Sequence, residues 1–279
     1  MKKGVSFFSF DMNVNLLEAA RKAAQAGYEG VEVVLSEAGS LNMYTSDKEL
    51  AALRAGIEDL GLTVCSVGAW NLWEHNLAGS DEKTAAHAQD IIKKQIDCAQ
   101  ALGTDAILVV PGWVGTNFAP GIVPYDQAYD NAQRRLAALA PYAQAAGVSI
   151  GVENVWNKFL LSPLEMKRFL DEINSPFVGD NFDVGNIIYI VYPDQWIRIL
   201  GQKHIKRIHF SDARAEQAGL GMFVDLLAGD VDFAAVMTAL RDIGYDGWIT
   251  VEFLPNYKCF PYQAITNARL SLDTILDIK

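Results

Sequence analysis

Short apolar runs alternate with longer amphipathic stretches along the whole chain. Each unit begins with a run of apolar or β-branched residues, continues through a polar loop, and ends in an alanine-rich stretch with apolar residues at helical spacing. Eight such units follow one another. The apolar runs, which we predict to be strands, are residues 4–9, 30–35, 63–67, 106–110, 149–153, 178–183, 205–210 and 248–253. The predicted helices are residues 13–26, 47–60, 82–102, 126–146, 163–173, 193–201, 232–243 and 262–277.

Residues that begin and end helices lie at the boundaries of these stretches. Ser46 or Asp47, with Glu49 following, is typical of a helix start, and so is Ser162-Pro163. Glycines end several of the predicted helices, at Gly27, Gly61, Gly103, Gly147 and Gly244. Strict alternation without a Pro/Ser-rich linker implies a parallel sheet, and eight units close into a barrel more naturally than they form an open sheet. We therefore predict an α/β chain with one domain, residues 1–279, folded as a single (β/α)8 TIM barrel with eight parallel strands.

Composition and charge narrow the class of function. Hydrophobic residues make up 51% of the 279 residues, which supports a large buried core and excludes a disordered chain. A net charge of -11 without a run of Lys or Arg argues against tight binding to a polyanion, so we expect a small-molecule partner and no nucleic acid. The longest apolar runs, such as 106–110, are far shorter than the ~20 residues of a bilayer span. We expect no membrane segment and no signal peptide.

The cysteines point to a reducing compartment. Cys65, Cys98 and Cys259 are odd in number, widely spaced, and contain no C-x-x-C pair. This pattern argues against a disulfide framework and against a thiolate zinc site. We predict three free thiols and a cytoplasmic location.

The last four predicted strands each end in a residue that can bind a metal. These residues are Glu153, Asp183, His209 and Glu252. Each is common alone, but all four lie at the same level of the predicted barrel, at the strand ends where barrel enzymes place their active sites. Three carboxylates and one imidazole form an oxygen-rich site. We predict one divalent metal ion there, with Mn²⁺ as the first expectation and Mg²⁺, Co²⁺ or Zn²⁺ as alternatives.

The alternation of side chains along a strand tests this placement. Gly151 and Glu153 share one face of their strand, and Thr250 and Glu252 share one face of theirs. Because the apolar face packs against the helices, both glutamates should point into the barrel mouth. In residues 178–183 the same rule turns Asp183 inward but places Asp180 against the helices, and the sequence offers no reason for that carboxylate.

The segments that carry these residues resemble the xylose-isomerase-like TIM barrel superfamily of sugar phosphate isomerases and epimerases. Within it they are most similar to the ketose 3-epimerases and the pentulose-5-phosphate 3-epimerases. The segments are GVENVWNKFLLSP, GDNFDVGN, IKRIHFSDAR, GDVDF at 229–233 and GYDGWITVEFLP. The resemblance implies that Glu153, Asp183, His209 and Glu252 hold the metal and that the two glutamates face opposite sides of the substrate. In such enzymes a metal-bound enediolate forms, and the glutamates act as the acid/base pair.

Two positions depart from the free-ketose epimerases. Asn186 stands where they have a histidine, three residues after the strand-end aspartate. Phe159 stands where a second acidic residue tends to follow the first glutamate by six positions. Asn186 can still donate a hydrogen bond to a substrate hydroxyl, although it cannot titrate near neutral pH. We therefore expect Asn186 to contact a substrate that differs from theirs.

Three further loop residues are candidate substrate contacts. His75, after the third strand, can reach a sugar hydroxyl or a developing oxyanion, or it is a surface loop histidine. Trp113, after the fourth strand, can form an apolar wall for a sugar, or it is a packed loop aromatic. Arg214, five residues after His209, can bind a hydroxyl or a phosphate, or it is a solvated charge.

The first functional hypothesis is therefore a divalent-metal-dependent isomerase or epimerase of carbohydrate metabolism, acting on a keto-sugar or sugar phosphate. The alternative is a metal-dependent lyase on the same scaffold. It would be an inosose or dehydroshikimate-type dehydratase, or would catalyse β-elimination on a keto-glycoside. Both reactions begin by removing a proton next to a ketone.

Two other classes fit less well. An abasic-site endonuclease needs several zinc ions, more histidines than the four present and a basic groove. A non-catalytic subunit would be expected to lack at least one of the four ligands. We also expect a homo-oligomer, in which Tyr257, Phe260 and Tyr262 are candidates for a subunit contact or a lid.

Overall fold

Eight parallel strands form a closed barrel in the computed structural model, which describes residues 1–11, 13–217, 220–252 and 257–279. The order around the barrel is β1-β10-β7-β6-β5-β4-β3-β2. The strands are β1 (Lys2–Ser6), β2 (Gly30–Leu35), β3 (Thr63–Ala69), β4 (Ala106–Val109), β5 (Ser149–Glu153), β6 (Val178–Asp183), β7 (Ile205–Phe210) and β10 (Trp248–Val251). The predicted (β/α)8 barrel is confirmed.

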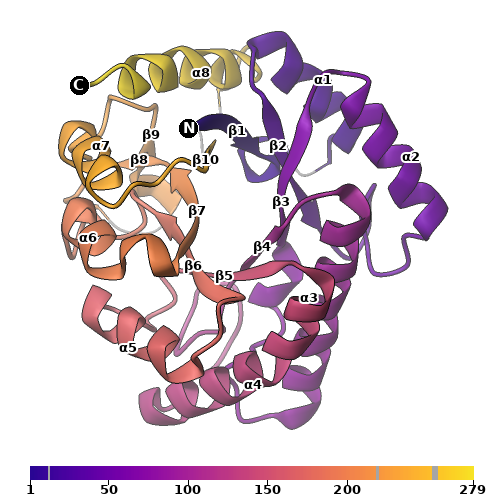
Figure 1. The fold of residues 1–279 in the computed structure, drawn as a ribbon, viewed down its shortest axis with the longest axis vertical. Helices are drawn as coiled ribbons and strands as arrows, with labels where there is room; N and C mark the ends of the chain where they lie inside the picture. The colour runs from indigo at the N-terminus through magenta and orange to yellow at the C-terminus, as the bar shows by residue number, and fades with distance from the viewer. Residues whose placement is uncertain (12, 218–219, 253–256) are drawn as a thin grey trace.

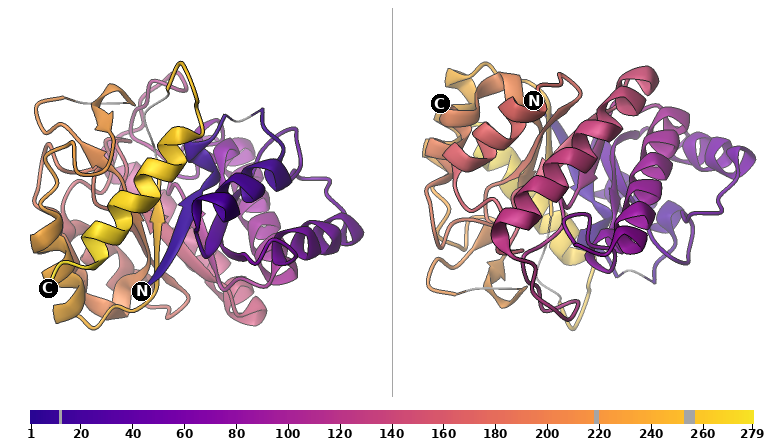
Figure 2. Two further views of the ribbon diagram at one scale, coloured as in Figure 1. Left: turned by 90° about the horizontal axis from the view of Figure 1, so that it is seen from above. Right: turned by 90° about the horizontal axis from the view of Figure 1, so that it is seen from below.

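Eight α-helices among the described residues surround the strands (Figure 1). They are α1 (Leu16–Ala26), α2 (Asp47–Glu58), α3 (Glu82–Leu102), α4 (Tyr125–Ala146), α5 (Pro163–Ile173), α6 (Pro193–His204), α7 (Phe233–Asp242) and α8 (Gln263–Leu276). The helices follow one another around the ring, and α8 lies beside α1 and completes it (Figure 1). The side views show the helices as an outer layer around the strands (Figure 2).

The helix ends follow the chemistry expected of their residues. At the start of α2, Ser46 and Glu49 form a reciprocal capping box between their side chains and backbone N–H groups. At the end of α1, Gly27 adopts a left-handed conformation with φ of 88°, and its N–H donates to the carbonyls of Ala23 and Ala24. A glycine adopts this conformation without steric cost, which is why it ends the helix and turns the chain toward β2.

The predicted boundaries differ from the structure mainly at the two terminal strands. The sequence pattern predicts a first strand at 4–9, but β1 ends at Ser6, whose hydroxyl accepts a hydrogen bond from the Phe8 N–H and begins a 3-10 turn, Phe7–Ser9 (η1). The last strand, predicted to reach Phe253, ends at Val251, and Phe253 lies outside the described residues. After β7, the short antiparallel pair β8 (Asp212–Ala213) and β9 (Phe223–Val224) has no counterpart among the predicted strands.

The core lies between the strands and the helices. Ile150, Val152 and Ile249 are fully buried there, as the alternation rule predicts. Asp180 also faces this layer, where one carboxylate oxygen accepts a hydrogen bond from the Trp196 indole N–H of α6 at 3.1 Å. The helix layer thus supplies the partner that the sequence does not reveal.

Two further sequence-based expectations concern the thiols and the membrane. Cys65 and Cys98 are buried, Cys259 is exposed, and all three are free. No helix in the described part of the chain is both long and apolar enough to cross a membrane.

Candidate metal centre and active site

Glu153, Asp183, His209 and Glu252 converge at the carboxyl ends of β5, β6, β7 and β10. We call these four residues the quartet. Each offers one ligand atom, and these four atoms all lie within 4.8 Å of one another. The strand register explains the convergence, because Asp183 pairs with His209 across β6 and β7, and His209 pairs with Thr250 across β7 and β10. All four side chains are buried.

The donor atoms of this quartet fit a divalent cation. Asp183 Oδ2 is buried and has no hydrogen-bond partner among the described residues, and the buried His209 Nδ1 and Glu252 Oε2 lie 3.2 Å from each other. Buried polar atoms are normally hydrogen-bonded, so an unpaired carboxylate oxygen beside an imidazole nitrogen and two further carboxylates indicates a ligand. Oxygen donors with one imidazole suit Mn²⁺, Mg²⁺ or Co²⁺, and also accommodate Zn²⁺.

Burial and mutual repulsion perturb the pKa values of the quartet. Burial, followed by the charge of Glu252, raises the pKa of Glu153 well above its ordinary value. Burial raises the pKa of Glu252 to about 7 and also raises that of Asp183. Burial alone would lower the pKa of His209, but the carboxylates of Glu32 and Glu252 raise it well above its ordinary value. Such crowding of acidic groups is relieved by protons or by a cation.

Asp183 is held by hydrogen bonds on the side away from its free oxygen. Its Oδ1 accepts from the N–H groups of Gly185 and Asn186 at 2.8 and 2.7 Å and from the Ser211 hydroxyl at 2.7 Å. Gly185 is required here, because a Cβ at that position would lie 2.3 Å from Ser211 Oγ. The side chain of Asn154 also pairs with the backbone N–H and carbonyl of Asp183, both at 2.8 Å. These contacts fix the orientation of the carboxylate.

Glu32 is a further residue of the site that the sequence analysis missed. It lies inside β2, fully buried in the barrel, and its Oε2 is 3.1 Å from His209 Nε2. Ser6 donates to its other oxygen at 2.6 Å, and Ser66 also donates to Glu32. Burial would raise the pKa of Glu32, but His209 and the two hydroxyls keep it below its ordinary value.

This contact determines which nitrogen of His209 is available. With Nε2–H donating to the Glu32 carboxylate, Nδ1 is left on the side of Glu252, whose Oε2 is 3.2 Å away. Carboxylates that hold metal-binding histidines in this way fix the tautomer of the ring.

One feature of the sequence could have identified Glu32. It is a glutamate within an otherwise apolar strand, at an inward-facing position.

An aromatic wall, which we define as Trp70, Trp73, Phe118 and Trp156, stands in the loops after β3, β4 and β5. Trp73 and Trp156 stack with ring centroids 5.4 Å apart, and Phe118 packs edge-on against Trp73 at 4.9 Å. Trp70 contacts Phe118 in turn at 5.7 Å. Trp73 is buried within this cluster, and Trp70, Phe118 and Trp156 are half-buried.

Asn186 joins the aromatic wall to the quartet. Its Oδ1 accepts from the Trp156 indole N–H at 2.9 Å, and its Nδ2 donates to Glu153 Oε1 at 3.2 Å. Its side chain is buried between the two residues. The predicted contact of Asn186 with a substrate stays a prediction, and the structure adds a second role, that of orienting Glu153.

Two other predicted substrate contacts form bonds within the protein. These residues are Trp113 and Arg214. Trp113 is buried, and its indole N–H donates to the backbone carbonyl of Trp73 at 3.3 Å. Arg214 is exposed and forms an ion pair with Asp230 at 3.3 Å. Neither residue belongs to the quartet, and their contacts with a substrate stay predictions.

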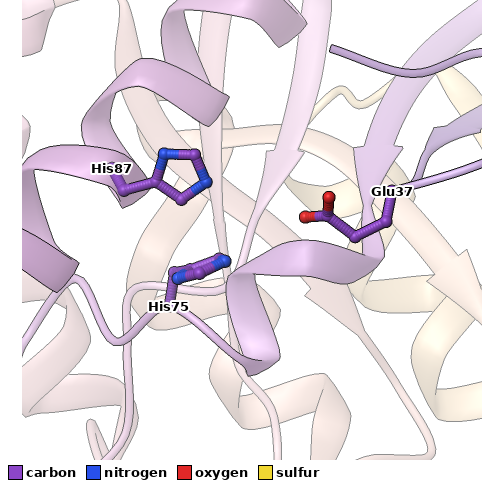
Figure 3. A group of neighbouring side chains, drawn as sticks. All are labelled: Glu37, His75 and His87. Carbon is purple, nitrogen blue, oxygen red and sulfur yellow. The ribbon is translucent and has the colours of Figure 1, made fainter.

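His75 lies in a second cluster, together with Glu37 and His87 (Figure 3). The rings of His75 and His87 meet edge to face with centroids 4.3 Å apart. Partial burial and then the neighbouring His87 lower the pKa of His75. The predicted role of His75 as a substrate contact is untested, and its immediate neighbours are these two side chains.

One family model matches most of the chain. Residues 20–275 match the model of the xylose isomerase-like TIM barrel family. An uncharacterized protein of Methanocaldococcus jannaschii is 24% identical over 90% of this chain and 83% of the relative. The L-ribulose 3-epimerase of Methylomonas sp. (strain DH-1) is 25% identical over 84% of this chain and 77% of the relative. An inosose dehydratase of Lacticaseibacillus casei is 27% identical, but the match spans only 55% of this chain and 56% of that enzyme.

Solved structures share the fold at lower sequence identity. A D-psicose 3-epimerase determined in the presence of D-fructose superposes with a TM-score of 0.81 at 18% identity, over 100% of this chain and 99% of the other. The IOLI protein with a bound zinc atom gives a TM-score of 0.80 at 19% identity, over 99% of this chain and 98% of the other. These similarities show the fold, and the match of residues 20–275 to the family model shows that the chain belongs to the xylose isomerase-like TIM barrel family.

Proposed function

We propose that the chain is a divalent-metal-dependent isomerase or epimerase acting on a small keto-sugar or keto-sugar phosphate. The observation that carries the proposal is the buried quartet, whose four ligand atoms converge within 4.8 Å and in which Asp183 Oδ2 has no partner among the described residues. Fold alone does not define a reaction, whereas these four side chains supply specific chemistry.

The quartet supplies both a cation site and two acid/base groups. Glu153, Asp183, His209 and Glu252 would hold the cation, for which Mn²⁺ is the first candidate. When bound, the cation supplies Lewis-acid stabilisation of the negative charge that develops on a ketone oxygen.

Glu153 and Glu252 enter the site from β5 and β10, with β6 and β7 between them. A substrate between the two glutamates presents one face to each. One glutamate removes the proton from the carbon next to the ketone, and the other, in its protonated form, returns a proton to the opposite face. The carbon is then inverted and each glutamate has exchanged one proton. Return of the proton to the adjacent carbon instead gives an aldose-ketose isomerisation.

Asn186 and the aromatic wall prepare this step. Asn186 fixes Glu153 through its hydrogen bond and is itself fixed by Trp156. The wall offers an apolar surface for the C–H face of a sugar and limits the access of water to the reacting carbon. Relatives named L-ribulose 3-epimerase and D-psicose 3-epimerase support a keto-sugar as the substrate class.

A metal-dependent lyase is the second candidate. The partial match to an inosose dehydratase favours it, and its first step is the same proton removal. The two candidates differ in the second step, because a lyase expels water or another leaving group from the carbon beyond. Glu153 or Glu252 would then protonate that leaving group.

Solvent-deuterium exchange followed by NMR tests the proposal. Protein with added Mn²⁺ is incubated in D₂O with a panel of ketoses, ketose phosphates and cyclic ketones. We expect deuterium at a carbon next to the ketone together with an epimer or an aldose, whereas loss of water would indicate the lyase.

Substitution of the two glutamates provides the control. Glu153→Gln and Glu252→Gln should each lower the exchange rate by about 10²- to 10⁴-fold, the usual contribution of a general acid or base. Glu58→Gln, at an exposed position on α2, should leave the rate unchanged. Absence of exchange on every substrate, or full exchange in both glutamine variants, would refute the proposal.

A further inference from the structure

Glu37, His75 and His87 form a cluster at the rim of the barrel, apart from the quartet. One ligand atom from each of these residues lies within 4.8 Å of the other two. We call this group the rim cluster. Figure 3 shows the Glu37 carboxylate pointing toward the two imidazoles, with His87 projecting from a helix.

The three residues come from separate parts of the chain. Glu37 lies two residues beyond the end of β2, and His75 two residues beyond the 3-10 turn Trp70–Trp73 (η2). His87 lies in the second turn of α3. The fold therefore brings Glu37 close to His75, which is 38 positions later in the chain, and to His87, which is 50 positions later.

We propose that the rim cluster is a second metal site, one that binds Zn²⁺. Two imidazoles and one carboxylate are a donor set that Zn²⁺ uses when a fourth position stays open to water. Imidazole donors also suit Co²⁺, Ni²⁺ and Cu²⁺, whereas Mg²⁺ and Mn²⁺ prefer oxygen. The rim cluster thus differs in kind from the quartet, which has one imidazole and three carboxylates.

Asn71 forms hydrogen bonds with two residues of the rim cluster. It is fully buried within η2, and its Nδ2 donates to Glu37 Oε1 at 2.7 Å, which leaves Oε2 for a metal. The Asn71 backbone carbonyl accepts the N–H of His75 at 3.1 Å. One buried residue therefore positions two of the three ligands, as residues behind metal ligands commonly do.

A metal at the rim cluster would connect the loop after β2 and the segment after η2 to α3. The same 3-10 turn carries Trp70 and Trp73 of the aromatic wall. Binding of Zn²⁺ would therefore restrict the motion of one side of the wall. The rim cluster is exposed enough to exchange its metal with solvent, since Glu37 and His87 are both exposed.

Metal stoichiometry tests the proposal. Protein without a polyhistidine tag is titrated with Zn²⁺ by calorimetry, and with Cu²⁺ followed by electron paramagnetic resonance. We expect two Zn²⁺ ions per chain, and a Cu²⁺ signal with two nitrogen donors from the rim cluster. His87→Ala and Glu37→Gln change exposed residues and should preserve the fold, but should weaken the second binding event by at least about tenfold.

Two controls separate the rim cluster from the quartet. His204→Gln removes another of the four histidines and should retain both Zn²⁺ ions. Asp183→Asn alters the quartet and should leave the two-nitrogen Cu²⁺ signal intact. Zn²⁺ binding that keeps its wild-type stoichiometry and affinity in both His87→Ala and Glu37→Gln would overturn the proposal. That result does not bear on the proton-transfer role of the quartet.

Hydrogen exchange tests the link to the aromatic wall. Zn²⁺ added to Mn²⁺-loaded protein should slow amide exchange in residues 70–76 of the wild-type protein and not in His87→Ala. Equal exchange with and without Zn²⁺ would overturn that link.

Discussion

Replacing Asp180 by Asn should stabilise the protein at neutral and alkaline pH. The carboxyl group lies fully buried between β6 and α6. One of its oxygens accepts from Trp196, and the other, Oδ1, has no partner among the described residues. Burial raises the pKa of Asp180 from 3.8 to about 8. Asn keeps the acceptor for Trp196 but cannot ionise.

The sign and size of the effect follow from proton linkage. The folded carboxyl holds a proton up to about pH 8, whereas the unfolded carboxyl loses it near pH 4, so the stability of the wild-type protein falls as pH rises between these values. Each pH unit within this range removes about 1.4 kcal/mol, which gives roughly 4 kcal/mol between pH 5 and pH 8. Because local relaxation and entry of water reduce such values, we expect the stability of Asp180→Asn to exceed that of the wild type by about 2 to 4 kcal/mol at pH 8.

Urea unfolding at several pH values from 5 to 8 measures this difference. Circular dichroism is the better signal, since the substitution adjoins Trp196 and alters its fluorescence. Other buried acids, including Glu153 and Glu252, contribute to the pH dependence of both proteins, and the difference between the proteins isolates Asp180. Asp59→Asn, at an exposed position after α2, should follow the wild type. Parallel curves for the wild type and Asp180→Asn would refute the reasoning.

Two further predictions concern the quartet. Glu32→Ala removes the carboxylate that accepts a hydrogen bond from His209 Nε2 and should weaken Mn²⁺ binding by about 10- to 100-fold. The electron paramagnetic resonance signal of free Mn²⁺ measures this affinity. Glu32→Gln keeps an acceptor oxygen and should lose less, and equal affinity in all three proteins would contradict the positioning role. Mn²⁺ affinity of the wild type should rise with pH through about 7, the pKa of Glu252, because binding displaces protons from the carboxyl groups. Calorimetry in buffers of different ionisation enthalpy detects those protons, and a pH-independent affinity without proton release would count against the assignment.

The barrel and the quartet could be predicted because both depend on local order in the chain. The spacing of apolar residues identifies strands and helices along the sequence. The last residue of each parallel strand must then lie at the same end of the barrel. Strand parity alone predicts that Glu153 and Asp183 point into the barrel mouth, where the structure brings them together. The same parity turns Asp180 outward, but its partner Trp196 lies on the following helix and only the packing reveals it.

Glu32 and the rim cluster could not be predicted in the same way. Glu32 contacts His209 across the barrel from 177 positions away, and it lies in mid-strand rather than at a strand end. No sequence signal marks His87, because it falls on an exposed helix surface. Its proximity to His75 depends on how the loop after β3 folds back toward α3, and no periodic pattern specifies that path.

The charges inside the barrel explain why the quartet and Glu32 belong to one system. Glu32 stays ionised beside His209, whose pKa is raised, so these two groups form a buried ion pair. Burial raises the pKa values of Glu153, Asp183 and Glu252, that of Glu252 to about 7, so these carboxyl groups hold protons more readily than they would in water. A divalent cation would displace protons from this group of carboxyls, and in the proposed reaction one glutamate would then accept a proton from the substrate while the other donates one. Under the proposed function, the environment that disfavours their ionisation in the absence of a cation would therefore couple cation binding to acid/base function.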